Sequence, residues 1–279
     1  MTRLEIVSFS LFIFLFFAFF PVIYDLRDSV MGNELAHHAP LVFALVGFLV
    51  YRKRGILTDC LKKPMPQGGP EFFVAGLCLN LLGQAAGIYY LAQISLPLTV
   101  FGMARYIVGV QFARQLIFPL LFLLLAFPIP GKIYMDVIFP LKLLVTKTSG
   151  IILTALGYPV KIHGNIIEIS SVFLGVVDAC SGLSSLMAIL TLSMFYSYLV
   201  IKRGLFRLTI VLSMLPLIIL ANVFRVTATA IVAVKWGSEM SEGTLHTLWG
   251  IVVFVLAVLG LIAITNMFRT LESREAHDL

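Results

Sequence analysis

The chain has 279 residues, of which 60% are hydrophobic and 12% are charged, and its mean hydropathy is +1.02. These values exclude an ordinary soluble domain and indicate an integral membrane protein. The net charge of +6 is no sign of a nucleic-acid partner, because the Lys and Arg residues lie between apolar segments, where they orient a chain in the bilayer. We expect the lipid bilayer, and no nucleic acid, as a partner.

Apolar runs long enough for about 20 residues of helix predict about eight transmembrane spans. The first run has the short basic start of a signal peptide, but it is too long, rich in Phe and without a small-residue cleavage site, so we predict a retained helix. The fold class predicted is an all-α polytopic membrane protein, with residues 1–279 as a single domain. The predicted spans are residues 4–23, 35–51, 71–92, 94–112, 114–129, 176–201, 208–234 and 246–268.

Charge between the spans predicts which side each loop occupies. The connections 52–70 and 202–207 are rich in Lys and Arg, which favours the cytoplasmic side. The connections 24–40 and 235–245 carry more acidic residues than basic ones and are expected outside. Both termini are then cytoplasmic.

Residues 128–176 differ from the rest of the chain, and we predict an outer-face interfacial helix followed by a small β-hairpin before the sixth span. Polar and apolar residues alternate on either side of Gly164 and Asn165, which is the pattern of a short hairpin. The helix is predicted because its two faces differ in polarity. The polar face holds Lys142, Thr146 and Ser149, and the apolar face holds Ile138, Leu141, Val145 and Ile152.

Three reactive side chains on separate spans are expected at similar depth on the outer side. Cys180 falls in the first turns of the sixth span, Arg225 lies in the outer half of the seventh, and His246 begins the eighth. Asn222 shares a helical face with Arg225, since the two are three residues apart. An Arg within a span costs roughly 2.5 to 3.5 kcal/mol on insertion scales and usually has a partner in the bundle interior. Its candidate anions are Asp178, a Cys180 thiolate and the oxyanion of a bound carbonyl.

These residue types suit acyl transfer. A nearby Arg or protonated His favours the thiolate, which is the form that attacks acyl groups. Cys180 would be the nucleophile, His246 the proton carrier, and Arg225 the electrostatic support for the tetrahedral intermediate. Each residue also has a simpler interpretation: Cys180 as a small packed hydrophobe, Arg225 in a structural pair with Asp178, and His246 as an ordinary interfacial residue.

Other residues are weaker candidates. His163, beside the predicted hairpin turn, is the main rival to His246, and Arg105 in the fourth span is either a contact for a substrate carboxylate or a packing residue. Ser181 and Ser184 could be nucleophiles only if a base lay closer to them than to the thiol. No metal or cofactor is expected, because the three cysteines lie in different segments and no set of ligands with metal-site spacing is evident.

The segments "GNIIEISSVFLGVVDACSGLSSL", "NVFRV" and "HTLWG" together resemble the exosortase/archaeosortase family of multi-pass membrane cysteine proteases. "FPIPGK" also fits this family, and the resemblance covers roughly Phe127 to Gly250. It implies a sortase-like transpeptidase in the cytoplasmic membrane of a bacterium, with the active site facing outside. Its substrates would be secreted proteins with a PEP-CTERM-like tail: a short sorting motif, one transmembrane helix and a basic end.

By position, the resemblance implies Cys180 as nucleophile, Arg225 as stabiliser of the oxyanion or substrate, and His246 as general acid and base. Cleavage would pass through a thioester that an acceptor amine, hydroxyl or water resolves. Supporting roles are expected for Asp178, Ser181, Asn222 and Ser184. Ser184 departs from the pattern, because many members have Arg directly after Cys-Ser-Gly-Leu, and this difference puts the tail motif in question.

Two other classes of function compete with this one. The first is a transporter or flippase in which Arg225, Asp178 and His246 form a relay through the membrane. Against it, these groups lie toward one side, with no matching set at inner depth. The second is a scaffold protein with a structural Arg225–Asp178 pair.

Overall fold

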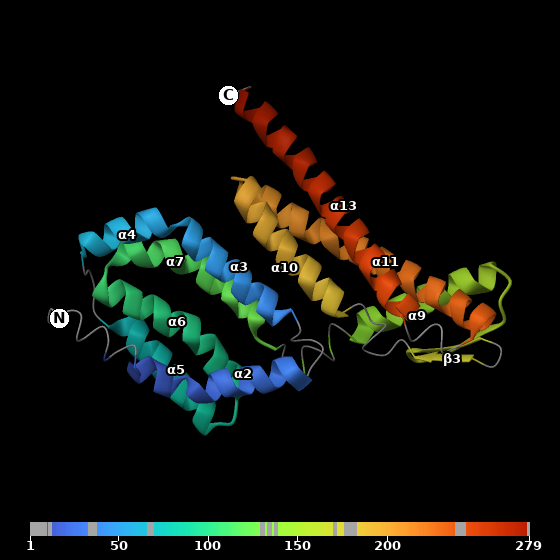
Figure 1. Ribbon diagram of the computed structural model, residues 1–279, viewed down its shortest axis with the longest axis horizontal. Helices are drawn as coiled ribbons and strands as arrows, with labels where there is room; N and C mark the ends of the chain where they lie inside the picture. The colour runs from blue at the N-terminus through green and yellow to red at the C-terminus, as the bar shows by residue number, and fades with distance from the viewer. Residues whose placement is uncertain are drawn as a thin grey trace. The chain divides into compact units, whose positions relative to one another are not determined.

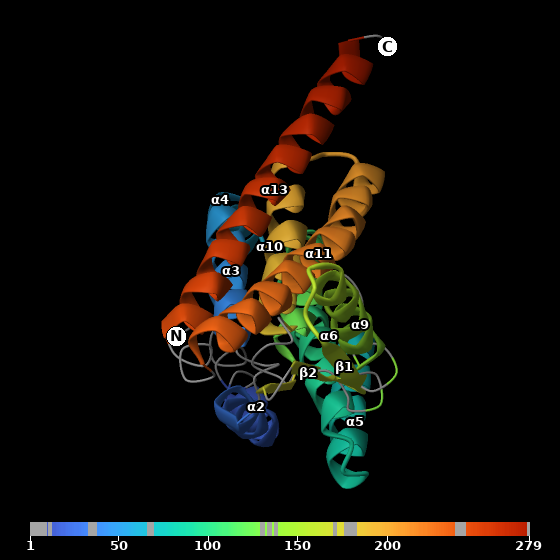
Figure 2. The ribbon, with the colours of Figure 1, turned by 90° about the vertical axis from the view of Figure 1, so that its right-hand side faces the viewer.

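The computed structural model shows a largely helical chain (Figures 1 and 2). It packs as two compact units, Met1–Pro130 and Gly131–Leu279. The residues described are 10, 13–32, 38–65, 70–128, 132, 136, 139–169, 172–175, 183–237 and 244–277. Of these, the backbone alone is described at 29–32, 183–185, 244–247, 249, 276 and 277.

The first unit is a set of helices. α5 packs against α6, α6 against α7, and α7 against both α3 and α4. The helices are α2 (Phe20–Gly32), α3 (Ala39–Arg52), α4 (Arg54–Lys62), α5 (Glu71–Ala85), α6 (Tyr89–Ile107), α7 (Val110–Leu123) and the short 3₁₀ helix η2 (Leu124–Ala126).

Helices α5 and α6 approach each other closely at small residues. A Cβ at Gly76 would overlap Thr99, and a Cβ at Gly83 would overlap Ala92. On α6, a Cβ at Gly102 would overlap the backbone of Phe73. Such close backbone approach is typical of helix pairs in membranes, where packing replaces the hydrophobic effect as the source of association.

Several predicted span limits are wrong by a few residues. The spans predicted at 71–92, 94–112 and 114–129 correspond to α5, α6 and α7. α5 begins as predicted and ends earlier, and α6 and α7 both begin and end earlier. The reason is two glycines with positive φ, Gly87 (67°) and Gly109 (126°), which end one helix and allow the next to start. At the N-terminal side, α2 continues to Gly32, well beyond the predicted end of the first span at residue 23.

The second unit is built around one long helix, α11. It contacts α9, α10, α13 and the strand β3. The elements are α9 (Phe139–Ala155), β1 (Val160–His163), β2 (Ile166–Ile169), β3 (Val172–Gly175), α10 (Leu183–Val200), α11 (Gly204–Trp236) and α13 (Thr244–His277).

The strands form an antiparallel sheet in the order β1-β2-β3. β1 and β2 flank the predicted turn at Gly164 and Asn165, with Gly164 at a φ of 63°. Ile167 and Ile169 are fully buried and pack on residues of α9 and α11. The third strand goes beyond the predicted hairpin, so the element is a three-stranded sheet with one face on the core.

Helix α9 turns its polar face inward, toward the rest of the second unit. Thr146 and Ser149 are fully buried and Lys142 is 6% exposed, and the Ser149 hydroxyl donates a hydrogen bond to the Val223 carbonyl of α11 at 3.3 Å. The apolar Ile151, in contrast, is 69% exposed. A helix surrounded by lipid has this arrangement, because polar groups are satisfied only inside the protein. An interfacial position for α9 remains a prediction.

Within the described ranges, α11 and α13 are the two helices long and apolar enough to cross a membrane; for α13 this holds over Gly250–Glu275. Four apolar helical segments are shorter: Ala39–Arg52, Glu71–Ala85, Val110–Ala126 and Leu186–Val200. Helices are present in all eight regions where spans are predicted, while the number that cross the membrane stays a prediction.

Candidate active site

Helices α11 and α13 pack against each other in opposite directions (Figure 2). A Cβ at Gly250 of α13 would lie 3.5 Å from Nη2 of Arg225 on α11. Further along α13, a Cβ at Gly260 would lie 2.7 Å from Cδ2 of Leu217, which comes earlier on α11. The two helices are therefore antiparallel, and Gly250 leaves room for the guanidinium of Arg225.

Arg225 belongs to a buried polar face of α11. Asn222, Arg225 and Thr229 are 7%, 8% and 5% exposed. They are three and four residues apart, so helical geometry puts them on one face. Among the described residues, the Thr229 hydroxyl has no hydrogen-bond partner. Thr229 was not among the residues predicted from the sequence, although its four-residue spacing from Arg225 indicates a position on the same helical face.

His246 lies in the first turn of α13, and only its backbone is described. It precedes Gly250 by four residues, so the two positions share a helical face. Because the helices are antiparallel, one turn before Gly250 on α13 corresponds to one turn after Arg225 on α11. The backbone position of His246 is thus level with Thr229.

Cys180, Asp178 and Ser181 lie outside the described residues, and Ser184 is described only as a backbone position in the first turn of α10. The elements on either side of Cys180 are described: β3 ends five residues before it, and α10 begins at Leu183, three residues after it. Helix α10 contacts both α11 and α13, and the preceding strand β3 contacts α11.

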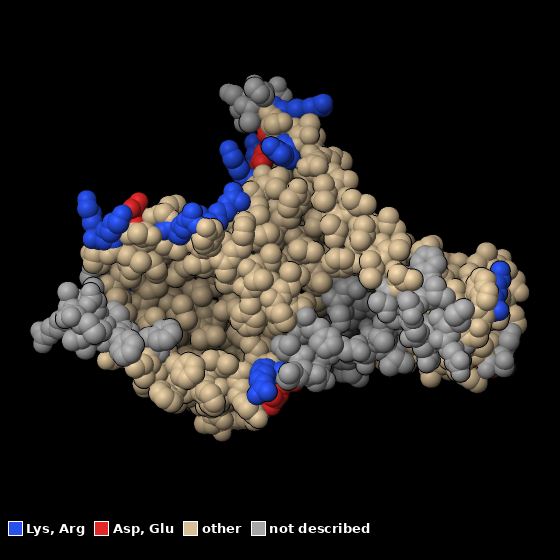
Figure 3. All heavy atoms as spheres, viewed as in Figure 1, with Lys and Arg blue, Asp and Glu red and all other residues tan. Residues whose placement is uncertain are grey.

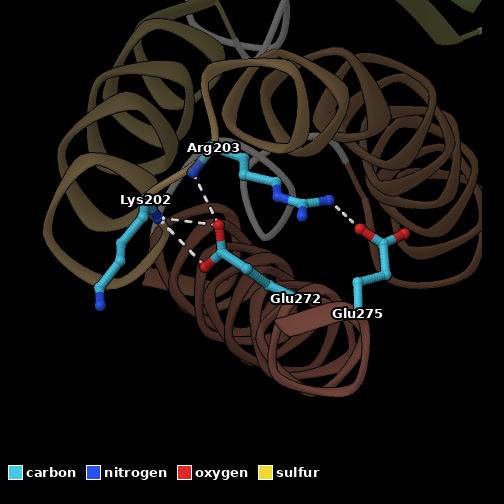
Figure 4. Close-up of polar contacts among 4 residues, drawn as sticks. All are labelled: Lys202, Arg203, Glu272 and Glu275. Atoms are coloured by element: carbon cyan, nitrogen blue, oxygen red, sulfur yellow. Dashed lines mark hydrogen bonds and ion pairs between the residues drawn. The ribbon is translucent and has the colours of Figure 1, made fainter. Parts of the chain in front are cut away.

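The opposite end of the same helix pair holds a polar clasp of Lys202, Arg203, Glu272 and Glu275 (Figure 4). The Glu272 carboxylate accepts hydrogen bonds from the backbone N–H of Arg203 at 2.7 Å and of Lys202 at 3.1 Å. Arg203 also pairs with Glu275. At 1.5 Å per residue, about 30 Å of helix separates this clasp from Arg225 and Gly250, which is about the thickness of a hydrocarbon core.

The rival candidates occupy other environments. His163 on β1 pairs with Glu168 at 3.1 Å and its side chain is 62% exposed, on the sheet face opposite the buried Ile167 and Ile169. Arg105 belongs to the first unit, where its guanidinium lies 5.1 Å from the centre of the Phe72 ring. His163 therefore has a partner at the surface, and Arg105 has an aromatic contact within α5 and α6.

The exposed surface of the helices is largely apolar. On the face shown in Figure 3, charged side chains gather in small groups and the surface between them is uncharged. Leu205 and Leu220 of α11 are 71% and 65% exposed, and Leu256 of α13 is 57% exposed. Exposed apolar area on this scale marks contact with lipid in helices of membrane-spanning length.

These features define a helical integral membrane protein. The chain belongs to the transmembrane exosortase family (Exosortase_EpsH), whose family model matches residues 29–263. The match extends across both compact units and includes the positions of Cys180, Arg225 and His246. Membership supports, in general terms, a membrane peptidase or transpeptidase of the cysteine type. No curated protein and no solved structure matches the chain.

Proposed function

We propose that this protein is a cysteine transpeptidase or protease that cleaves the C-terminal sorting tails of secreted proteins at the outer face of the bacterial cytoplasmic membrane. The main observation in support of the proposal is that Arg225 is buried and its guanidinium lies next to Gly250 of α13. Arg225 lies about one helical turn from the level of the His246 backbone position, on α11, which contacts both elements that flank Cys180. A cation, an imidazole and a thiol are the groups that suit acyl transfer, and the proposal brings them together here.

In the proposed reaction the Cys180 thiolate attacks the carbonyl carbon of the scissile peptide bond. Arg225 stabilises the resulting oxyanion by charge and hydrogen bonding. The C–N bond breaks as His246, in its protonated form, donates a proton to the leaving amine, which departs with the transmembrane tail. The product on the protein is a thioester between Cys180 and the secreted domain.

The second half of the reaction reverses these roles. An acceptor amine, hydroxyl or water attacks the thioester carbonyl while His246 removes its proton, and the Cys180 thiolate leaves. The secreted domain is thereby transferred or released for sorting to the cell surface. Supporting roles are assigned to Asp178 and Ser181 beside the thiol, and to Asn222 beside Arg225. Ser184 is a candidate for selecting the tail motif.

The sidedness of the site is part of the proposal. The Lys202–Arg207 connection is basic, which favours the cytoplasm. Arg225 and Gly250 lie about 30 Å of helix away from this end, close to the opposite headgroup layer. A nucleophile at that level is suited to a peptide bond next to a membrane-embedded tail.

The proposal is tested by comparing secreted and membrane proteins from cells with the wild-type chain, without the chain, and with Cys180→Ala. Tailed proteins should lose their C-terminal helix only with the wild-type chain, while the Cys180→Ala protein still inserts. Cys60→Ala, in α4, is the matched control and should process normally. Full processing by Cys180→Ala would overturn the thiol mechanism, and it would be the outcome that a transporter or scaffold predicts.

A further inference from the structure

The strand β3 has a free edge in the part of the chain that the structure describes. In the sheet order β1-β2-β3, one side of β3 pairs with β2. Beyond that ladder, its backbone makes no hydrogen bond to any described residue. A row of unpaired N–H and C=O groups is a template for another extended strand.

The two edges of the sheet differ in how well their side chains oppose pairing with another strand. β1 carries Lys161 and His163, and charged residues on an edge strand oppose pairing with another chain. β3 reads Val-Phe-Leu-Gly, with no charge and no Pro. Leu174 packs against the core on one face, while Phe173 on the other face is 69% exposed. As far as the described residues show, β3 is therefore the edge strand without a charged side chain to oppose pairing.

The β3 edge is also directly connected to the proposed nucleophile. β3 ends at Gly175, five residues before Cys180 in the sequence, and five residues of chain cover at most about 18 Å. A peptide of about five extended residues covers the same distance. One end of a strand added to β3 can therefore occupy the ladder while the other reaches Cys180.

We propose that the protein binds its substrate by β-strand addition: the extended segment of a secreted protein just before its terminal helix adds as a fourth strand to the edge of β3. Backbone hydrogen bonds supply affinity in this mode without requiring particular side chains, and alternate side chains of the segment contact Phe173. The added strand holds the segment extended, which exposes its peptide bonds to the thiol. This inference rests on the proposed function, because it names the way in which that site holds its substrate.

The inference is tested by disulfide trapping in membranes. The enzyme carries Cys180→Ala with Cys60→Ser and Cys78→Ser, so that substrate is not cut and no other thiol is present, together with Phe173→Cys. The probe is a secreted reporter fused to the tail of a protein that the wild-type chain processes. Single cysteines are placed at consecutive positions before its terminal helix. Lys161→Cys, exposed on the same sheet face but on the β1 edge, is the matched control.

Strand addition predicts disulfides with Phe173→Cys at every second substrate position, because alternate side chains of a strand share a face. Lys161→Cys should give none. A repeat of three to four residues would mean a helical substrate, and equal trapping at Lys161→Cys would mean no preference for β3; either result overturns the inference. A disulfide between two copies of Phe173→Cys in place of the substrate would assign this edge to self-association and also overturn it.

The two proposals fail separately. If the wild-type chain cuts the tailed reporter but trapping lacks the two-residue repeat, the strand addition is wrong and the transpeptidase stands. If the wild-type chain cuts no tailed protein, the proposed function is wrong and the inference falls with it.

Discussion

Arg225 of α11 and Gly250 of α13 form a matched pair across antiparallel helices, with a Cβ at position 250 lying 3.5 Å from the Arg225 Nη2 atom. That distance is an ordinary van der Waals contact, so Gly250→Ala should process substrate close to the wild-type rate. Gly250→Leu should lower the rate at least tenfold, because its longer side chain must displace the guanidinium. Processing of a tailed reporter measures both. Gly47→Leu, where a Cβ meets nothing within 4 Å, should be neutral, and equal losses for the two Leu variants would exclude a specific contact with Arg225.

Removal of the Arg225 charge should be costly for the reaction. Loss of an oxyanion-stabilising donor typically lowers the rate about 10²- to 10³-fold, and we expect this for Arg225→Ala. Arg225→Lys keeps the charge but loses the forked geometry, and should lie between Ala and wild type. Reporter processing is measured at equal protein in the membrane. Arg207→Gln, at the other end of the same helix, is the control; an Arg225→Ala variant as active as this control would contradict the assigned role.

The Thr229 hydroxyl is buried level with His246, and we expect it to position the imidazole. Thr229→Val, which keeps the shape and removes the hydroxyl, should lower processing about 3- to 10-fold, as expected for one hydrogen bond. It should also shift the pH dependence of the rate, and Thr229→Ser should restore both. Thr227→Val is the control, since the Thr227 hydroxyl donates to the Val223 carbonyl of its own helix. An unchanged pH profile in Thr229→Val would rule out a connection to His246.

The clasp at the other end of the helix pair should affect stability more than the reaction. Glu272→Gln weakens two hydrogen bonds from the backbone of Lys202 and Arg203, and it should lower the stability in detergent by about 1 kcal/mol. Glu275→Gln should cost less, because exposed ion pairs contribute about 0 to 1 kcal/mol. Thermal unfolding of the purified protein measures both. A larger loss from Glu275→Gln than from Glu272→Gln would contradict this order.

The predicted sidedness can be tested by thiol labelling. A membrane-impermeant maleimide added to intact spheroplasts should label Cys180 and leave Cys60 unlabelled, because Cys60 lies in α4, within the basic 52–70 connection. Permeabilised cells serve as the control, in which Cys60 becomes reactive. Labelling of Cys60 in intact spheroplasts, with Cys180 protected, would reverse the orientation.

Much of the prediction of the candidate site came from helical periodicity and from the charge of the loops. Arg225 and Asn222 are buried together on one face of α11, as their spacing predicts. The position of His246 near the Arg225 level follows from two long antiparallel helices joined by a short connection. The role of Gly250 could not be predicted, because a glycine in a sequence does not reveal which side chain from another helix occupies the space beside it.

The fold was harder to predict where a helix face can meet either water or the rest of the protein. The polar residues of α9 share one face, as periodicity predicts, but Val145 of the predicted apolar face is buried beside them. Periodicity also does not tell whether the polar face meets water or protein. In the structure the polar face meets protein, because α9 packs against α11 and the Ser149 hydroxyl donates a hydrogen bond to the Val223 carbonyl. Helix limits shifted for a local reason, since the positive φ at Gly87 and Gly109 leaves no trace in the hydropathy of the apolar runs around them.

The length of α11 has a consequence for how the protein responds to its membrane. Its 33 residues extend about 50 Å, against about 30 Å for a hydrocarbon core. The clasp fixes one end of the α11–α13 pair, so the height of Arg225 above it is set by helical rise and not by the lipid. A bilayer of different thickness therefore leaves the placement of Arg225 against Gly250 unchanged and alters what surrounds it, with headgroups and water at Arg225 in a thin membrane and acyl chains in a thick one.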